Sequence, residues 1–279
     1  MNSRTLQTNG ITLHYLDSAT DGPVLLLTHG LTANAHAFDG LIAAGLADNL
    51  RVISVDLRGR GLSDKPATGY TMADHAADLI GLMDALGLVD AIVGGHSFGG
   101  LLTFYIAHHY SDRVTKLVIL DAAAQLHPQT RKMLIPAIGR LGKTVASFDA
   151  YIAQIKSAPY MTTGWDDAMT SYYRADVEAL PDGSVRPRSS PDIILEAITK
   201  GSFGEVWPDI IRSVQQPTLL VNGRDDYALA APLLPANLAM ETVGMMSNCR
   251  YVAVPGNHQT MLYGPGADQL TKAVVEFCR

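Results

Sequence analysis

A five-residue turn, Gly95-His96-Ser97-Phe98-Gly99, constrains the fold of this chain more than any other stretch of its sequence. It joins the apolar residues 91–93, which are typical of a buried strand, to an apolar helix predicted from about residue 101 to residue 109. A strand can enter a helix through so short a turn only when small residues flank the apex, because the apex takes a strained backbone conformation. The turn pushes the hydroxyl of Ser97 out of the sheet. Small residues also surround serines at ordinary turns, so the pattern predicts a nucleophile only together with partners elsewhere in the chain.

The rest of the chain alternates apolar runs with amphipathic ones. Apolar runs typical of buried strands occur at residues 23–29, 51–57, 114–120, 217–223 and 250–255. Helices are predicted at residues 35–47, 71–86, 229–243 and 266–277. An N-terminal hairpin is predicted from strands 5–8 and 11–16, which Asn9-Gly10 joins. The alternation predicts an α/β fold with a mostly parallel sheet and helices on both faces, whose strand ends place Ser97 and the loop after His29 along one edge.

The alternation stops between residues 122 and 206. This segment carries helical patterns, several methionines, many aromatic residues and a turn rich in Pro, Ser and Arg. We interpret it as a helical cap inserted into a core formed by residues 1–121 and 207–279. Any single aromatic residue is explained well enough by packing within the cap, but some of them together are expected to line a pocket.

The composition argues against several kinds of partner and site. A net charge of −6 without a basic cluster argues against nucleic acid and against an anionic membrane. The N-terminal residues lack a signal-peptide pattern, and no run reaches the roughly 20 apolar residues that span a bilayer, so a cytoplasmic location is expected. Cys249 and Cys278 lack metal-site or disulfide spacing, although Cys278 stays open as a reactive thiol. We expect no metal and no cofactor, and a homodimer stays open.

Four features, in this order along the chain, resemble the α/β-hydrolase family, in its serine carboxylesterase or lipase-like branch with a cap domain. They are His29-Gly30 after an early strand, the turn around Ser97, the stretch Gly223-Arg224-Asp225-Asp226 after a late strand, and His258 near the C-terminus. The resemblance covers essentially the whole chain. It implies the family's fold, with a mostly parallel central sheet, helices on both faces and an inserted helical cap.

The resemblance also implies roles for individual residues. Ser97 would attack an acyl carbon, and His258 would take its proton and return it to the leaving group. The backbone N–H groups of Leu31 and Phe98 would form the oxyanion hole. His29 matches the residue that orders the oxyanion loop, whereas His96, beside the nucleophile, is expected to pack rather than react.

The acid that orients His258 has two candidates. The family most often places it after the late strand, at the fourth position of a G-x-x-D pattern, which selects Asp226 over Asp225. Some members place it after the preceding core strand, where this chain has Asp121. We favour Asp226 and keep Asp121 as the alternative.

A serine at the turn points to acyl transfer, and it argues against the epoxide-hydrolase and dehalogenase branches, which carry aspartate there. We therefore predict a carboxylic-ester hydrolase acting on small to medium esters, since nothing in the sequence suggests an interfacial anchor. Lactonase and C–C bond hydrolase activities are alternatives on the same three residues. A small-molecule receptor on the same fold is an alternative of another class, although a complete set of Ser97, Asp226 and His258 favours an enzyme.

Overall fold

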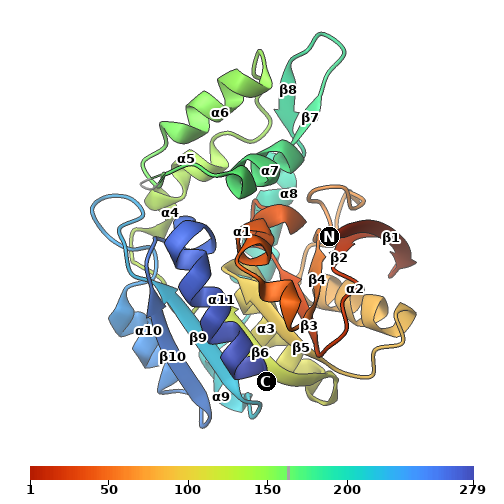
Figure 1. Cartoon of the computed structure of the whole chain (residues 1–279), viewed down its shortest axis with the longest axis vertical. Helices are drawn as coiled ribbons and strands as arrows, with labels where there is room; N and C mark the ends of the chain where they lie inside the picture. Colours follow the sequence, from red (N-terminus) through yellow and green to blue (C-terminus); the bar gives the residue numbers. More distant parts are fainter. Residues whose placement is uncertain (162–163) are drawn as a thin grey trace.

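The computed structural model describes residues 1–161 and 164–279 and is built around one eight-stranded sheet (Figure 1). The strands are β1 (Asn2–Thr8), β2 (Ile11–Asp17), β3 (Val24–Thr28), β4 (Arg51–Val55), β5 (Ala91–His96), β6 (Val114–Leu120), β9 (Thr218–Gly223) and β10 (Cys249–Val254). Their order in the sheet is β1-β2-β4-β3-β5-β6-β9-β10. The pairs β1–β2 and β2–β4 are antiparallel, and all the others are parallel.

Alternate residues of each central strand enter two separate hydrophobic clusters, one on each face of the sheet. In β3, Leu26 joins one cluster, whereas Leu25 and Leu27 join the other. This is the side-chain period of two that a strand imposes, and burial on both faces explains the unbroken apolar runs of the sequence. The predicted mostly parallel sheet with helices on both faces is therefore confirmed.

Helices cover both faces of the sheet. One face is covered by α2 (Met72–Ala85), α3 (Phe98–His109), α9 (Trp207–Ser213) and α10 (Ala236–Val243), and the other by α1 (Asp39–Ala43) and α11 (Gly264–Cys278). Short 3₁₀ helices lie at Ala35–Phe38, Leu46–Asp48, Ser111–Arg113 and Thr260–Leu262. The N-terminal hairpin is confirmed, with Asn9 and Gly10 both at positive φ in its turn.

Two predicted helices are shorter than the sequence pattern indicated. The helix predicted at residues 35–47 is broken into α1 and two 3₁₀ helices, because Gly45 takes a left-handed conformation with a φ of 87°. The helix predicted from residue 229 begins only at Ala236. Leu229 and Ala230 both have positive φ, and Pro235 stands at the N-cap of the helix.

The segment between β6 and β9 holds its own small elements. They are α4 (Thr130–Met133), α5 (Ile135–Ile138), α6 (Phe148–Lys156), α7 (Asp167–Asp176), the strands β7 (Val177–Ala179) and β8 (Val185–Pro187), α8 (Pro191–Glu196) and a π-helical turn at Ala197–Ser202. Figure 1 shows α5, α6, α7 and the β7–β8 hairpin gathered at one end of the molecule, beyond the sheet. That residues 122–206 form a separate cap domain stays a prediction. Tyr151, Tyr172 and Tyr173 of this segment are buried and in ring contact, so these aromatics pack together.

Candidate active site

The candidate site forms where parallel strands end side by side. The last residue of β5, His96, pairs with the last residue of β6, Leu120. The residues that follow these strands, Ser97 and Asp121, are therefore brought to neighbouring positions at one sheet edge. The amide of Ser97 donates a hydrogen bond to the carbonyl of Leu120 at 2.9 Å, which fixes the start of the turn.

Ser97 takes the strained conformation that its sequence context predicted. Its φ is 56° and its ψ is −114°, a region that residues with a side chain rarely adopt. A Cβ on Gly95 would lie 2.2 Å from the backbone of Gly99, and a Cβ on Gly99 would lie 2.2 Å from the carbonyl oxygen of Thr28. Both flanking glycines are therefore required by close backbone contact. The turn leaves Ser97 half-buried at the N-terminus of α3.

His258 follows β10 and is hydrogen-bonded to Asp121. Its Nδ1–H donates to Oδ2 of Asp121 at 2.7 Å, and both side chains are buried. The other carboxylate oxygen, Oδ1, accepts from the side-chain amide of Asn222 at 2.7 Å and from the amide of Gly223 at 2.9 Å. Asp121 itself has a φ of 50°, which turns the chain sharply after β6. The carboxylate is thus held on both oxygens and presents one of them to His258.

The preference for Asp226 as the partner of His258 is wrong for this structure, and the alternative, Asp121, occupies that position. The side chain of Asp226 is exposed, and its main-chain carbonyl accepts from Asn257 at 3.1 Å. One sequence signal could have identified Asp121. Asn222 is a polar residue within an otherwise apolar buried strand, and such a residue requires a buried polar partner.

The loop after β3 lies beside Ser97 and carries the first predicted oxyanion donor. A Cβ on Gly30 would lie 3.5 Å from the Cβ of Ser97. Within the described residues, the amides of Leu31 and Phe98 donate no hydrogen bond, so both are available to a ligand. This arrangement fits the predicted oxyanion hole.

His29 fixes this loop through hydrogen bonds to the main chain. Burial lowers its pKa to about 4, so the ring is neutral at ordinary pH. Its Nε2 accepts from the amide of Leu57 at 3.1 Å, which leaves the proton on Nδ1 to be donated to the carbonyl of Gly30 at 2.7 Å. That carbonyl belongs to the same peptide group as the Leu31 N–H, so His29 holds the plane of a predicted oxyanion donor.

His96 packs against the site, as its position beside Ser97 predicted. Its Nε2 donates to the main-chain carbonyl of His258 at 2.8 Å, and the two ring centroids lie 4.5 Å apart. Burial, with a smaller effect of His258, holds the pKa of His96 well below its usual value. A neutral His96 can position His258, and its one ring proton is already donated to the main chain.

Tyrosines lie next to His258. The ring of Tyr227 stands perpendicular to the His258 ring at 5.7 Å, and Tyr160 stacks on Tyr227 at 5.2 Å. The side-chain amide of Asn257 also donates to the carbonyl of Tyr160 at 2.8 Å. Residues of the segment between β6 and β9 therefore reach the candidate site, which supports the expectation that some of its aromatics approach a substrate.

Arg140, which sequence reasoning missed, ties the same segment to the oxyanion loop. Its Nη2 donates to the carbonyl of Thr32 at 3.0 Å and to Oδ1 of Asp176 at 3.1 Å. Tyr151 donates to the other oxygen of Asp176. No local pattern indicates this role, because its partners lie 36 and 108 residues away in the sequence.

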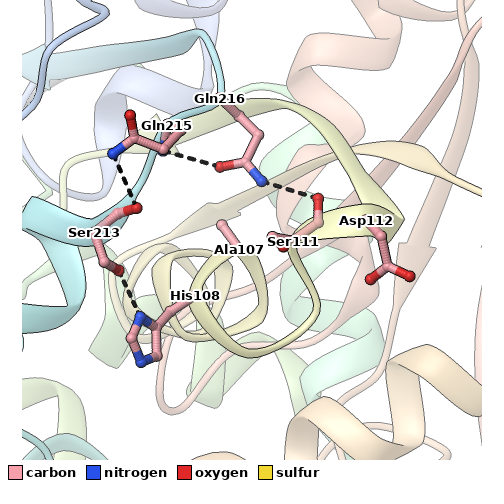
Figure 2. Close-up of a pocket in the computed structure, with 7 residues that line it drawn as sticks. All are labelled: Ala107, His108, Ser111, Asp112, Ser213, Gln215 and Gln216. Carbon is pink, nitrogen blue, oxygen red and sulfur yellow. Dashed lines mark hydrogen bonds between the residues drawn. The ribbon is translucent and has the colours of Figure 1, made fainter.

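A surface hollow elsewhere in the molecule is not part of this site. Figure 2 shows it at the C-terminal end of α3, the opposite end from Ser97, where Ser213 contacts His108 at 2.5 Å. The hydroxyl of Ser213 donates to the carbonyl of Ile210 at 2.7 Å. The hydroxyl proton is therefore engaged by the backbone, and in the contact with His108 the Ser213 oxygen acts as the acceptor.

The described parts of the chain also bear on the expectations for a reactive thiol, a metal site and a membrane-spanning helix. Burial raises the pKa of Cys278 to about 11, which disfavours the reactive thiolate. Over residues 1–161 and 164–279, no three His, Cys, Asp or Glu side chains gather as metal ligands would. Over the same residues, no helix is both long and apolar enough to cross a bilayer.

Comparisons with known proteins identify the family. The family model for the α/β hydrolase fold matches residues 23–230. The 2-(acetamidomethylene)succinate hydrolase of Mesorhizobium japonicum is 31% identical over 259 residues, which cover 91% of this chain and 87% of that protein. The non-heme chloroperoxidase of Streptomyces lividans is 28% identical over 84% of this chain and 87% of its own.

A solved structure extends the comparison to the whole chain. The crystal structure of E-2-(acetamidomethylene)succinate hydrolase superposes with a TM-score of 0.86 at 28% identity, and the match covers 99% of this chain and 98% of that one. The strained serine turn, the buried His–Asp pair and these matches lead to one conclusion: the chain belongs to the α/β hydrolase fold family and is a hydrolase.

Proposed function

We propose that this protein is a serine hydrolase that cleaves small carboxylic esters through an acyl-enzyme on Ser97. The observation that carries the proposal is the buried hydrogen bond of 2.7 Å between His258 and Asp121, beside a serine held at positive φ. A histidine fixed in this way keeps its Nδ1 proton, so its Nε2 is free to accept one. A protein that only binds its ligand has no use for such a nucleophile and base.

The proposed reaction begins with attack of the Ser97 hydroxyl on the substrate carbonyl while His258 accepts the proton. The carbonyl oxygen becomes an oxyanion, which the amides of Leu31 and Phe98 stabilise. Each such donor typically lowers the barrier by about 3 kcal/mol. His258 then protonates the departing alcohol, and the acyl group stays on Ser97. Water, deprotonated by His258, releases the acid and restores the enzyme, with Asp121 stabilising the histidine cation at both steps.

Amide hydrolysis is a second candidate, and the comparisons favour it specifically. The relative and the solved structure are both hydrolases of a succinate that carries an acetamidomethylene group. Cleaving that amide would use the same serine: Ser97 would take the acetyl group, the acetyl C–N bond would break, and His258 would protonate the departing nitrogen. Lactone and C–C substrates stay as alternatives on the same residues.

Hydrolysis of a p-nitrophenyl ester series, from acetate to palmitate, tests the proposal with wild type beside Ser97→Ala. We expect turnover that depends on Ser97 and is greatest for short or medium chains. Parallel reactions with 2-(acetamidomethylene)succinate and with a simple lactone separate the alternatives. Failure of the wild type to turn over any of these substrates would contradict the proposal and favour the small-molecule receptor.

A further inference from the structure

Three successive carbonyls of the loop after β3 each accept a hydrogen bond from the side chain of a histidine or an arginine. His29 donates to the carbonyl of Gly30, Arg60 donates through Nε to that of Leu31 at 3.1 Å, and Arg140 donates to that of Thr32. The loop carrying the Leu31 amide is therefore held at three successive carbonyls, each by a different side chain.

The two arginines differ in how their charge is compensated. Arg140 faces the carboxylate of Asp176 through two nitrogens, at 3.1 and 3.2 Å. Arg60 is 0% exposed and has neutral partners instead. Its Nη1 donates to the carbonyl of Arg58 at 2.8 Å and lies 3.1 Å from Nε2 of His75. Its Nη2 has no hydrogen-bond partner among the described residues.

The groups around Arg60 do not cancel its charge. His75 donates its Nδ1 proton to the carbonyl of Thr71 at 2.7 Å, so its Nε2 offers Arg60 a lone pair. Burial and the two neighbouring arginines hold the pKa of His75 well below its usual value, so the ring is neutral. The carboxylate of Asp78 is engaged by Arg58, at 2.6 and 2.7 Å. The buried carboxylate of Asp56 is hydrogen-bonded to His14 and to the amides of Ala35 and Leu62, and within the described residues neither carboxylate forms an ion pair with Arg60. Burial lowers the pKa of Arg60 to about 10, which still leaves the guanidinium charged at neutral pH.

Arg60 contacts both residues whose amides form the proposed oxyanion hole. It holds the carbonyl of Leu31, and its guanidinium carbon lies 5.4 Å from the ring centroid of Phe98. The same guanidinium carbon lies 5.9 Å from the ring centroid of Tyr70. A buried charge without an ion-pair partner is costly in a folded protein, and this one lies beside the residues of the proposed oxyanion hole.

We propose that Arg60 is a positioning residue of the oxyanion hole, which fixes the Leu31 loop and whose uncompensated positive charge stabilises the oxyanion that forms on the substrate. The inference rests on the proposed serine-hydrolase function. It adds a long-range charge to the two backbone donors, in a buried setting where a charge acts strongly on its neighbours.

A trifluoromethyl ketone tests this charge directly. Such a ketone adds to a catalytic serine, and the resulting hemiketal oxygen occupies the place of the oxyanion. Fluorine NMR against pH gives the pKa of that oxygen. At a separation of about 10 Å and an effective dielectric constant of about 20, a unit charge contributes about 1.7 kcal/mol, which shifts a pKa by about one unit. We therefore expect Arg60→Met to raise the hemiketal pKa by about one unit.

A matched pair of variants changes the charge without removing Arg60. His75→Glu places a carboxylate against Nη1 of Arg60, whereas His75→Gln has the same length without the charge. We expect the glutamate variant to raise the hemiketal pKa relative to the glutamine variant, which should stay close to wild type. If charge at this position does not reach the oxyanion, the two variants will have equal hemiketal pKa values, so this pair can still refute the proposal if Arg60→Met fails to fold.

Equal hemiketal pKa values for His75→Glu and His75→Gln would overturn the proposal, as would an unchanged value in folded Arg60→Met. Failure of wild-type Ser97 to form any adduct would instead contradict the serine-hydrolase function, and the role of Arg60 with it. An adduct in the wild type with no response to charge would leave the hydrolase function standing and refute the inference about Arg60 alone.

Discussion

Replacing Asp121 with asparagine should abolish nearly all activity, and the structure gives the reason. Asn222 and the Gly223 amide both donate to Oδ1 of Asp121, so an asparagine there keeps its oxygen on that side. Its NH₂ group must then face Nδ1 of His258. Because that nitrogen would have to accept, the histidine proton moves to Nε2, where it blocks proton transfer from Ser97.

A misplaced histidine proton of this kind lowers kcat by a factor of about 10⁴, which corresponds to about 5 kcal/mol of barrier. Asp226→Asn is the matched control, since it makes the same chemical change at an exposed side chain. Initial rates with p-nitrophenyl acetate should fall by about 10⁴ for Asp121→Asn and by less than about twofold for the control. A large loss for Asp226→Asn, with Asp121→Asn retaining activity, would refute this account of His258.

Three further predictions concern stability and are checked by urea unfolding. Gly99→Ala should lower the free energy of unfolding by about 3 kcal/mol or more, because the added Cβ would overlap the carbonyl of Thr28. Gly164→Ala, with open space around the added Cβ, should change the free energy of unfolding little. Equal effects of the two substitutions would contradict the packing described. Thr71→Ala should lower the free energy of unfolding by about 1 kcal/mol, because it removes the capping box of α2. An unchanged free energy of unfolding would argue against that cap. Burial lowers the pKa of His29 from 6.5 to about 4, so between these pH values the unfolded chain binds more protons than the folded one. About 3 kcal/mol of the free energy of unfolding should therefore be lost as the pH falls through this range. A free energy of unfolding that stays constant across the range would contradict a buried neutral His29.

Much of the site could be predicted from local sequence. The glycines around Ser97 predicted a strained turn, and the structure shows the close backbone contacts that require them. His258, in the loop after the last strand, was predicted through the order of motifs, and the parallel strands bring that loop to the same edge of the sheet. These features depend on residues close together in the chain or on the regular geometry of a parallel sheet.

What could not be predicted depends on how separate segments meet. Asp121 and Asp226 each follow a strand at the same sheet edge, and apart from the buried polar Asn222 the sequence offers no sign of which carboxylate reaches His258; the turn geometry decides it. Arg60 lies within a polar, glycine-rich loop, where a surface position is the usual expectation. Its complete burial follows from packing against Leu31, His75 and Phe98, which come from three other parts of the chain.

The central claim is that Ser97 carries the acyl group during turnover. Rapid-quench mass spectrometry with p-nitrophenyl acetate, followed by peptide mapping, tests this claim most directly. We predict that one acetyl group appears on the peptide containing Ser97 within the first turnover, and that Ser97→Ala shows neither the acetyl group nor turnover. Turnover by the wild type with no modification of Ser97, or with the acetyl group on another residue, would contradict it.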